Sequence, residues 1–208
     1  MMKMSRSSLE RFAVSGRRLA AVLCALSLAF GAWPASAELR YTTIYREKLV
    51  EGTTPEQLWR YMTEHPIIDE DGPALANITH DHKLSVKTER SDGVCRVSNL
   101  DFTWNFVITL PKAVDEVRMT PAVRAMWREF THYLKGHENA HRTIFIGCGR
   151  DFVPEAEKLT TRGPCFVLKH RVKQLVDKRY KACMAKQRAF DRDEHKSLPK
   201  LALHKASH

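Results

Sequence analysis

The clearest pattern in the chain is a strict alternation of apolar and polar residues from 100 to 110. The apolar positions are Leu100, Phe102, Trp104, Phe106, Ile108 and Leu110. Successive side chains of a strand point to opposite faces, so this alternation predicts a strand with one packed face. A weaker alternation over Lys83–Glu89 and a turn at Ser91-Asp92-Gly93 precede it, which predicts a hairpin that ends at Pro111. Earlier β-forming residues predict a further strand over Leu39–Val50.

Two helix starts are marked by a threonine followed by a proline. Thr54 is followed by Pro55 and Gln57, the pattern of a capping box. Thr120 and Pro121 predict the start of a much longer helix. Its apolar stripe is Val123, Met126, Trp127, Phe130, Leu134, Ile144, Phe145, Cys148 and Phe152.

A second long helix is expected after the break at Arg162-Gly163-Pro164. Its stripe is Leu168, Val172, Leu175, Val176, Tyr180 and Cys183. The order strand, helix, hairpin, helix, helix predicts an α+β fold. We expect a small antiparallel sheet packed on the long helix and on the second, C-terminal helix.

The N-terminus has the composition of an export signal. Met1–Arg18 is basic, Leu19–Phe30 is an apolar run, and Ala35-Ser36-Ala37 is a small-residue cleavage site. The run is shorter than the roughly 20 residues that cross a bilayer. We therefore predict a Sec-type signal peptide over residues 1–37, cleaved after Ala37, and a periplasmic or secreted protein with no stable membrane insertion. An uncleaved anchor is the alternative. The domain is expected over residues 38–196 and a flexible tail over 197–208.

Charge and cysteine content refine this interpretation. The full chain has a net charge of +10, of which the predicted signal peptide carries +4. The remaining charge is modest and spread along the mature chain without a basic stripe that carries stacking aromatics, so nucleic acid is not an expected partner. Cys95, Cys148, Cys165 and Cys183 remain after signal removal, and an even number in an exported chain predicts disulfides. Cys165 and Cys183 lie on one predicted helix roughly 27 Å apart, whereas a disulfide needs Cα atoms within about 7 Å. Each is expected to pair with Cys95 or Cys148, in either combination.

The apolar stripe of the long helix is interrupted by two histidines. They lie in the motif His137-Glu138-Asn139-Ala140-His141. Residues four apart share a helix face, so both imidazoles can reach one Zn²⁺ at about 2.0–2.1 Å. Glu138 is rotated about 100° from His137 and can take a proton from water on the metal. The motif therefore predicts a zinc site with two histidine ligands and Glu138 as general base. Two core histidines, each satisfied by other partners, are the alternative.

A catalytic zinc site needs a third protein ligand. The densest group of candidates follows the second helix, at residues 191–195. His195 is the first choice and Asp191 the second. Tyr133 and Tyr180 are candidates for stabilising an oxyanion, although each also fits an ordinary tyrosine at the edge of a core. If the strand that ends at Leu110 lies at a sheet edge, an extended peptide can pair with its backbone.

Three stretches of the chain resemble a bacterial family described as predicted secreted zinc-dependent proteases. They are Cys95–Pro111 (CRVSNLDFTWNFVITLP), His137–Arg142 (HENAHR) and Gln187–His195 (QRAFDRDEH). The order of elements and the signal peptide also match. The resemblance implies that the two histidines of the motif bind zinc and that Glu138 is the base. Near the C-terminus the family pattern has a Thr before the His and a Gly after it. Here the Thr is missing and Lys196 follows His195, so the third ligand stays open.

Motif and resemblance together predict an exported zinc-dependent peptidase, a hydrolase that acts on a peptide or protein substrate. The alternative is a non-catalytic periplasmic module that binds a metal or a partner. The two differ at the fourth coordination position, which holds water in a catalytic site and a protein ligand in a structural one.

Overall fold

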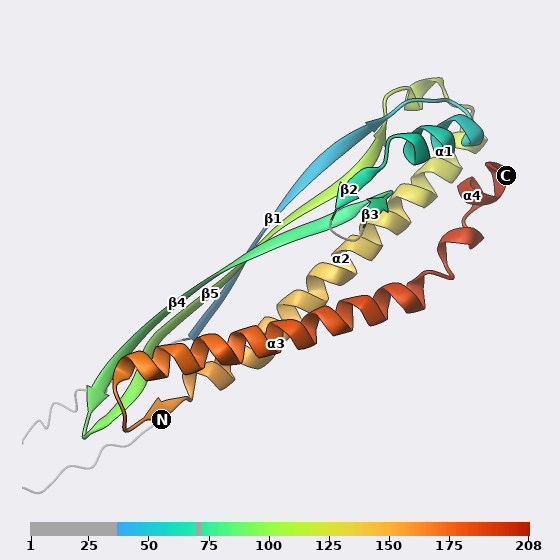
Figure 1. The fold of residues 1–208 in the computed structure, drawn as a ribbon. Coiled ribbons are helices and arrows are strands. Elements are labelled where there is room, and N and C mark those ends of the chain that lie inside the picture. The colour runs from blue at the N-terminus through green and yellow to red at the C-terminus, as the bar shows by residue number, and fades with distance from the viewer. Residues whose placement is uncertain (1–36, 70–71) are drawn as a thin grey trace, which may run out of the picture. The chain divides into compact units, whose positions relative to one another are not determined.

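The computed structural model describes residues 37–69 and 72–208. All but the last residue of the predicted signal peptide lies outside this part of the chain. The elements, in order, are β1 (Ala37–Val50), α1 (Pro55–Glu64), β2 (Ile67–Asp69), β3 (Gly72–Ala74), β4 (Asn77–Ser91), β5 (Val94–Ala113), η1 (Glu116–Arg118), α2 (Pro121–Glu157), β6 (Thr160–Thr161), α3 (Cys165–Glu194), η2 (Leu198–Lys200) and α4 (Ala202–Ala206) (Figure 1).

The predicted α+β fold is confirmed, with a small sheet, a long helix and a C-terminal helix. The main sheet has the order β1-β5-β4, and the short β6 pairs with the start of β5. β4 and β5 form the predicted antiparallel hairpin. β1 runs parallel to β5, so the sheet is mixed and the expectation of a purely antiparallel sheet is wrong. Parallel neighbours need a long crossover, and α1 with β2, β3 and β4 supplies it.

β5 is the central strand and is longer than its sequence pattern predicted. It continues past Pro111 to Ala113. Proline is tolerated there because β4 reaches β5 no further than Thr109, which leaves Pro111 paired only with Lys48 of β1. β5 as a whole is the central strand and not an edge of the main sheet, so the condition on which peptide docking there was expected is not met. The edges of the main sheet are β1 and β4.

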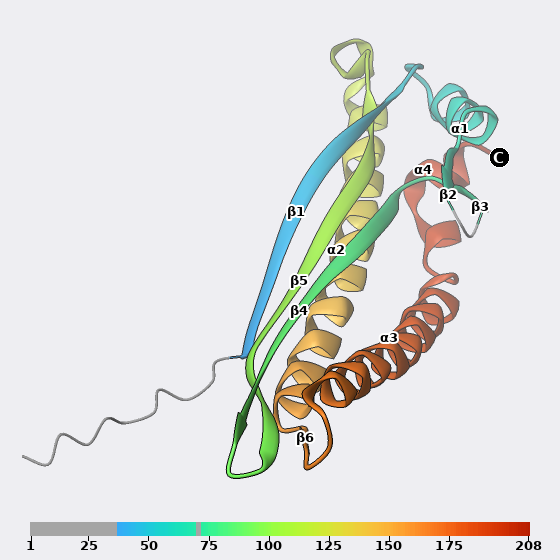
Figure 2. The ribbon, with the colours of Figure 1, turned by 60° about the vertical axis from the view of Figure 1, so that its left-hand side comes forward.

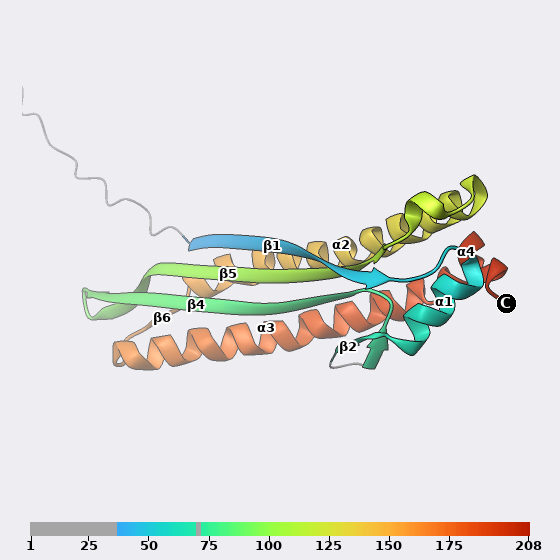
Figure 3. The same cartoon turned by 90° about the horizontal axis from the view of Figure 1, so that it is seen from above.

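α2 and α3 lie on one face of this sheet and run in opposite directions (Figures 2 and 3). The alternating apolar residues of β5 are buried against them, as predicted. Those fully or almost fully buried are Leu100, Phe102, Trp104, Phe106 and Ile108. α2 approaches the strands closely at Gly149, where a Cβ would meet the Leu39 side chain at 2.9 Å. The absence of a side chain at this position lets the helix pack directly on the sheet.

The predicted caps of the first two helices are confirmed. The Thr54 side chain accepts a hydrogen bond from the Gln57 backbone N–H at the start of α1. Thr120 does the same for Val123 at the start of α2. The Gln57 side chain accepts from the N–H of Thr53 rather than from that of Thr54, so the capping box closes one residue earlier than expected.

Two hydrophobic clusters divide the core. The first, here called the sheet cluster, joins β5 residues from Cys95 to Phe106 with α2 from Phe145 to Ala156 and with α3 from Leu168 to Cys183. The second, here called the end cluster, joins α1, the first half of α2 and Leu203 of α4. The stripe of α2 passes from the end cluster to the sheet cluster between Leu134 and Phe145. The histidine motif occupies this interval.

Both disulfides belong to the sheet cluster. Cys95 of β5 is bonded to Cys165 at the start of α3, and Cys148 of α2 is bonded to Cys183 of α3. This is one of the two combinations that the sequence left open. The two bonds are consistent with a secreted or periplasmic protein. Within the described residues, no helix has the length and apolar character needed to cross a membrane.

The expectation of a flexible tail over residues 197–208 is wrong. η2 and α4 form there, and Leu203 is fully buried in the end cluster. His204 packs edge-on against Trp59 of α1, with ring centroids 4.6 Å apart. Leu198 and Leu201 also pack against the end cluster, so three leucines of a largely polar segment dock it there.

Candidate metal centre

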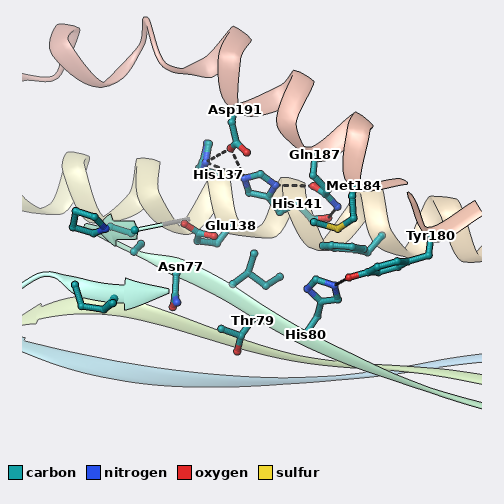
Figure 4. A pocket seen from close by; sticks show the side chains of 17 residues that line it. Asn77, Thr79, His80, His137, Glu138, His141, Tyr180, Met184, Gln187 and Asp191 are labelled. Atoms are coloured by element: carbon teal, nitrogen blue, oxygen red, sulfur yellow. Dashed lines mark hydrogen bonds and ion pairs between the residues drawn. The ribbon is translucent and has the colours of Figure 1, made fainter. Parts of the chain in front are cut away.

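His137 and His141 bring their Nε2 atoms within 3.1 Å of each other. They lie one turn apart on the same face of α2, as the spacing predicted. Asp191 approaches from α3, and its Oδ1 lies 2.8 Å from His141 Nε2 and 3.4 Å from His137 Nε2 (Figure 4). Ligand atoms of the three residues all lie within 4.8 Å of one another. The second choice for the third ligand is therefore the residue in position.

His195, the first choice, is not part of this group. It is the exposed C-cap residue of α3, and its backbone N–H bonds to the Asp191 carbonyl. It follows Asp191 by four positions, which places it about 6 Å farther along the helix axis. The sequence therefore pointed to the correct segment, residues 191–195, but not, as its first choice, to the correct residue in it. Because α3 stays helical to Glu194, Asp191 lies beside the two histidines and His195 lies one turn beyond them.

Gln187, which the sequence analysis did not single out, supports His141 from α3. Its Oε1 lies 2.7 Å from His141 Nδ1, and its Nε2 donates to the His141 backbone carbonyl at 3.1 Å. The side chain is buried, with 4% of the residue exposed. Steps of four residues lead from Cys183 to Gln187 and Asp191, so an extension of the predicted α3 stripe is the signal that would have found it.

The group is chemically suited to a divalent cation. Nε2 of His141 faces both His137 and the carboxylate of Asp191. One proton on that nitrogen can serve only one of these two contacts, whereas a cation attracts all three ligand atoms. Two imidazoles and a carboxylate are a donor set of catalytic zinc sites. Burial lowers the pKa of His137, and the neighbouring His141 lowers it further, against the opposing effect of Asp191. A neutral imidazole is the form that binds a metal.

A cleft of about 440 Å³ opens beside these residues. Both histidines, Asp191 and Gln187 line it, as does Glu138, which is 5% exposed. Figure 4 shows Glu138 on the side of α2 that faces Asn77 of β4, while Asp191 comes from α3. Glu138 thus borders the same space as the histidines from a different direction. This is the placement that the rotation along the helix predicted.

The two tyrosines proposed as oxyanion stabilisers differ in position. Tyr180 lines the cleft, and its hydroxyl lies 3.0 Å from Nε2 of His80. Burial lowers the pKa of His80, and His82 acts in the same direction. Tyr133 does not line this cleft; its hydroxyl lies 3.4 Å from Oε2 of Glu194. Burial raises the pKa of Tyr133, and the Glu194 charge adds to the effect.

Asn77 is a further polar group of the cleft that the sequence pattern did not reveal. It is buried, and within the described part of the chain its Oδ1 has no hydrogen-bond partner. Residues 76–80 all line the cleft, so side chains from both faces of the start of β4 border it. A strand with consecutive residues along a cleft presents its edge there, and β4 is an edge strand of the main sheet.

Comparison with known proteins adds one finding. A family model described as "Bacterial protein of unknown function (DUF922)" matches residues 45–197. This range contains the whole metal group, both disulfides and the cleft. Neither the curated proteins nor the solved structures gave a match.

Proposed function

The chain belongs to the DUF922 family of bacterial proteins of unknown function, and from that starting point we propose that it is an exported zinc-dependent peptidase. The observation that carries the proposal is the convergence of His137, His141 and Asp191 beside a cleft that Glu138 also lines. The resemblance to predicted secreted zinc-dependent proteases, noted from the sequence, agrees with it.

Zinc would be held by the two histidines of α2 and by Asp191 of α3. When bound, Zn²⁺ supplies a Lewis acid that polarises a carbonyl group and makes water acidic near neutral pH. Three protein ligands leave the fourth position for substrate or water, which favours a catalytic site over a structural one. The same residue types also bind Fe²⁺ in some enzymes, so the identity of the metal has to be measured.

Glu138 is the proposed general base. Its buried carboxylate lies next to His137 in the chain but borders the cleft from another side of α2. It is therefore placed to take a proton from the attacking water and to pass it to the leaving amine. Tyr180 is the better placed of the two candidate oxyanion stabilisers because it lines the cleft, whereas Tyr133 is directed to Glu194.

A peptide substrate is supported by the strand beside the cleft. β4 borders it with residues 77–80, and its outer edge is not paired in the described main sheet. An extended peptide can add to such an edge through backbone hydrogen bonds. The Oδ1 of Asn77 offers one more acceptor at the same place.

The decisive variant is Glu138→Gln, which preserves shape and removes the base. The purified mature chain is loaded with zinc and incubated with a complex peptide mixture, and products are identified by mass spectrometry. We expect cleavage by the wild type, a loss of about 100-fold or more in the variant, and one bound zinc in both. Glu129→Gln is the matched control, because Glu129 is exposed on the same helix.

Three results would contradict the proposal. Full activity of Glu138→Gln would remove this base from the mechanism. A wild type that binds zinc but cleaves nothing would support the non-catalytic metal-binding module instead. A wild type that binds no zinc under chelator-free conditions would leave the histidines as core residues.

A further inference from the structure

Gln187 uses both ends of its amide on a single residue. One end contacts the ring of His141 at Nδ1, and the other contacts the backbone carbonyl of the same histidine. Neither the motif nor the family description assigns it a role. A buried amide is costly unless its polar atoms are paired. Here both are paired with His141, so the two side chains are fixed relative to each other.

The contacts determine which nitrogen of His141 carries the proton. A carbonyl oxygen can only accept, so the amide atom that faces the His141 carbonyl is the NH₂ group of Gln187. The atom that faces the ring is then the amide oxygen, which also can only accept. Nδ1 of His141 must therefore be the protonated nitrogen. In the neutral ring this leaves Nε2 bare, and Nε2 is the atom that faces His137 and Asp191.

We propose that Gln187 is the positioning residue of the metal centre, which holds His141 in its metal-binding tautomer and orientation. The inference rests on the metal centre of the proposed function. Gln187 lies one turn before Asp191 on α3. One helix thus delivers both a ligand and the group that prepares another ligand, and a shift of α3 would disturb the two together.

An amide and a carboxylate at position 187 should differ in how strongly they raise the basicity of the His141 ring. Residues that accept from the second nitrogen of a ligating histidine orient its ring and raise its basicity. A carboxylate at position 187 would donate more electron density through His141 than the neutral amide does. Replacement by glutamate is expected to retain the tautomer, because a carboxylate oxygen also accepts from Nδ1, but it removes the N–H that the amide donates to the His141 carbonyl.

The experiment compares Gln187→Leu and Gln187→Glu with the wild type in two ways. Nitrogen-15 NMR of the His141 ring in metal-free protein reports which nitrogen is protonated. Competition with a chromophoric chelator measures zinc affinity. For Gln187→Leu we expect loss of the Nδ1–H tautomer and an affinity lowered about 10- to 100-fold. Gln187→Glu should keep the tautomer, because it keeps an oxygen that accepts from Nδ1. Gln174→Leu, on an exposed position of α3, should change neither.

Several outcomes would overturn the inference. A folded Gln187→Leu protein with unchanged tautomer and unchanged zinc affinity would do so. If that variant does not fold, Gln187→Glu decides, and a lost tautomer in it counts against the role of Gln187. Should the wild type bind no zinc, the metal centre itself fails, and the tautomer measured without metal still tests whether Gln187 sets it.

Discussion

The sheet cluster and the end cluster are stabilised in different ways. The sheet cluster contains both disulfides and the buried face of β5. The end cluster contains none of the described cysteines and is held by packing of α1, α4 and the start of α2. The candidate metal centre lies where α2 leaves one cluster for the other. Two of its ligands are carried by α2, and the third comes from α3, whose position is fixed by covalent bonds in the sheet cluster.

We expect the stability of the fold and the geometry of the metal centre to be separable. Cys148 lies two turns beyond His141 on α2, and Cys183 lies one turn before Gln187 on α3. Their bond therefore fixes the crossing at which Asp191 reaches the histidines. The bond between Cys95 and Cys165 ties β5 to the far end of α3. The two disulfides should contribute similarly to folding and differently to metal binding.

Removing each disulfide in turn tests this separation. These variants should lower the free energy of unfolding more than any other change considered below. The separations of 70 and 35 residues predict losses of about 4.4 and about 3.8 kcal/mol in the chain-entropy treatment. Cys95→Ala/Cys165→Ala is thus expected to lose slightly more stability in urea unfolding. Cys148→Ala/Cys183→Ala is expected to lose zinc affinity, while the other pair retains it. An equal loss of affinity in both would show that neither bond has a special relation to the metal centre.

Leu203→Ala tests the cluster that lacks disulfides. Truncation of a fully buried leucine typically lowers the free energy of unfolding by about 2–5 kcal/mol. We expect a value near the middle of this range by urea unfolding and no change in zinc affinity, since α4 contributes no ligand. Leu49→Ala is the control, because Leu49 is 56% exposed and should change stability by no more than about 0.5 kcal/mol. A large fall in zinc affinity for Leu203→Ala would mean that the end cluster also positions the site.

Zinc binding should change the free energy of unfolding less than the disulfide and Leu203 variants do. Its effect should be centred on the boundary between the two clusters, where the metal centre lies. At a free concentration of 100 times Kd, a ligand that binds only the folded state adds about 2.7 kcal/mol. Hydrogen exchange with and without chelator should show the gain at residues 187–194 of α3 and around His137, and little change at residues 95–106 of β5. Identical exchange in both conditions would contradict a metal centre at this boundary.

Local features of the site followed from the sequence, whereas features that depend on the crossing of α2 and α3 did not. The spacing of His137 and His141 fixes their shared face on any helix, and the threonine caps act within a few residues. The choice between Asp191 and His195 depends on where α3 passes α2, which no local pattern encodes. Gln187 escaped notice for the same reason, because a glutamine on a helix is ordinary until its partner is known.

The sheet was predicted incompletely on similar grounds. The alternation in β5 revealed a half-buried strand, but the pattern does not state which strand lies beside it or in which direction. β1 pairs with β5 only after the intervening elements have folded back, so its parallel course is a property of the whole chain. The C-terminal segment shows a different case, in which Leu198, Leu201 and Leu203 dock a largely polar stretch that composition alone marked as a tail.

The parallel pairing of β1 has a kinetic consequence, because a chain is synthesised from its N-terminus. β1 emerges first, yet its partner on β5 follows only after α1 and the β4 strand, as in the pair Ala37 and Leu100. During that interval Tyr41, Ile44 and Leu49 belong to an unpaired strand, and even in the folded protein these three remain about half exposed. Contacts between distant parts of a chain form slowly, and unpaired strands recruit other chains. Overproduction should therefore favour aggregates nucleated by this first strand, and a lysine in place of Ile44 should raise the soluble yield.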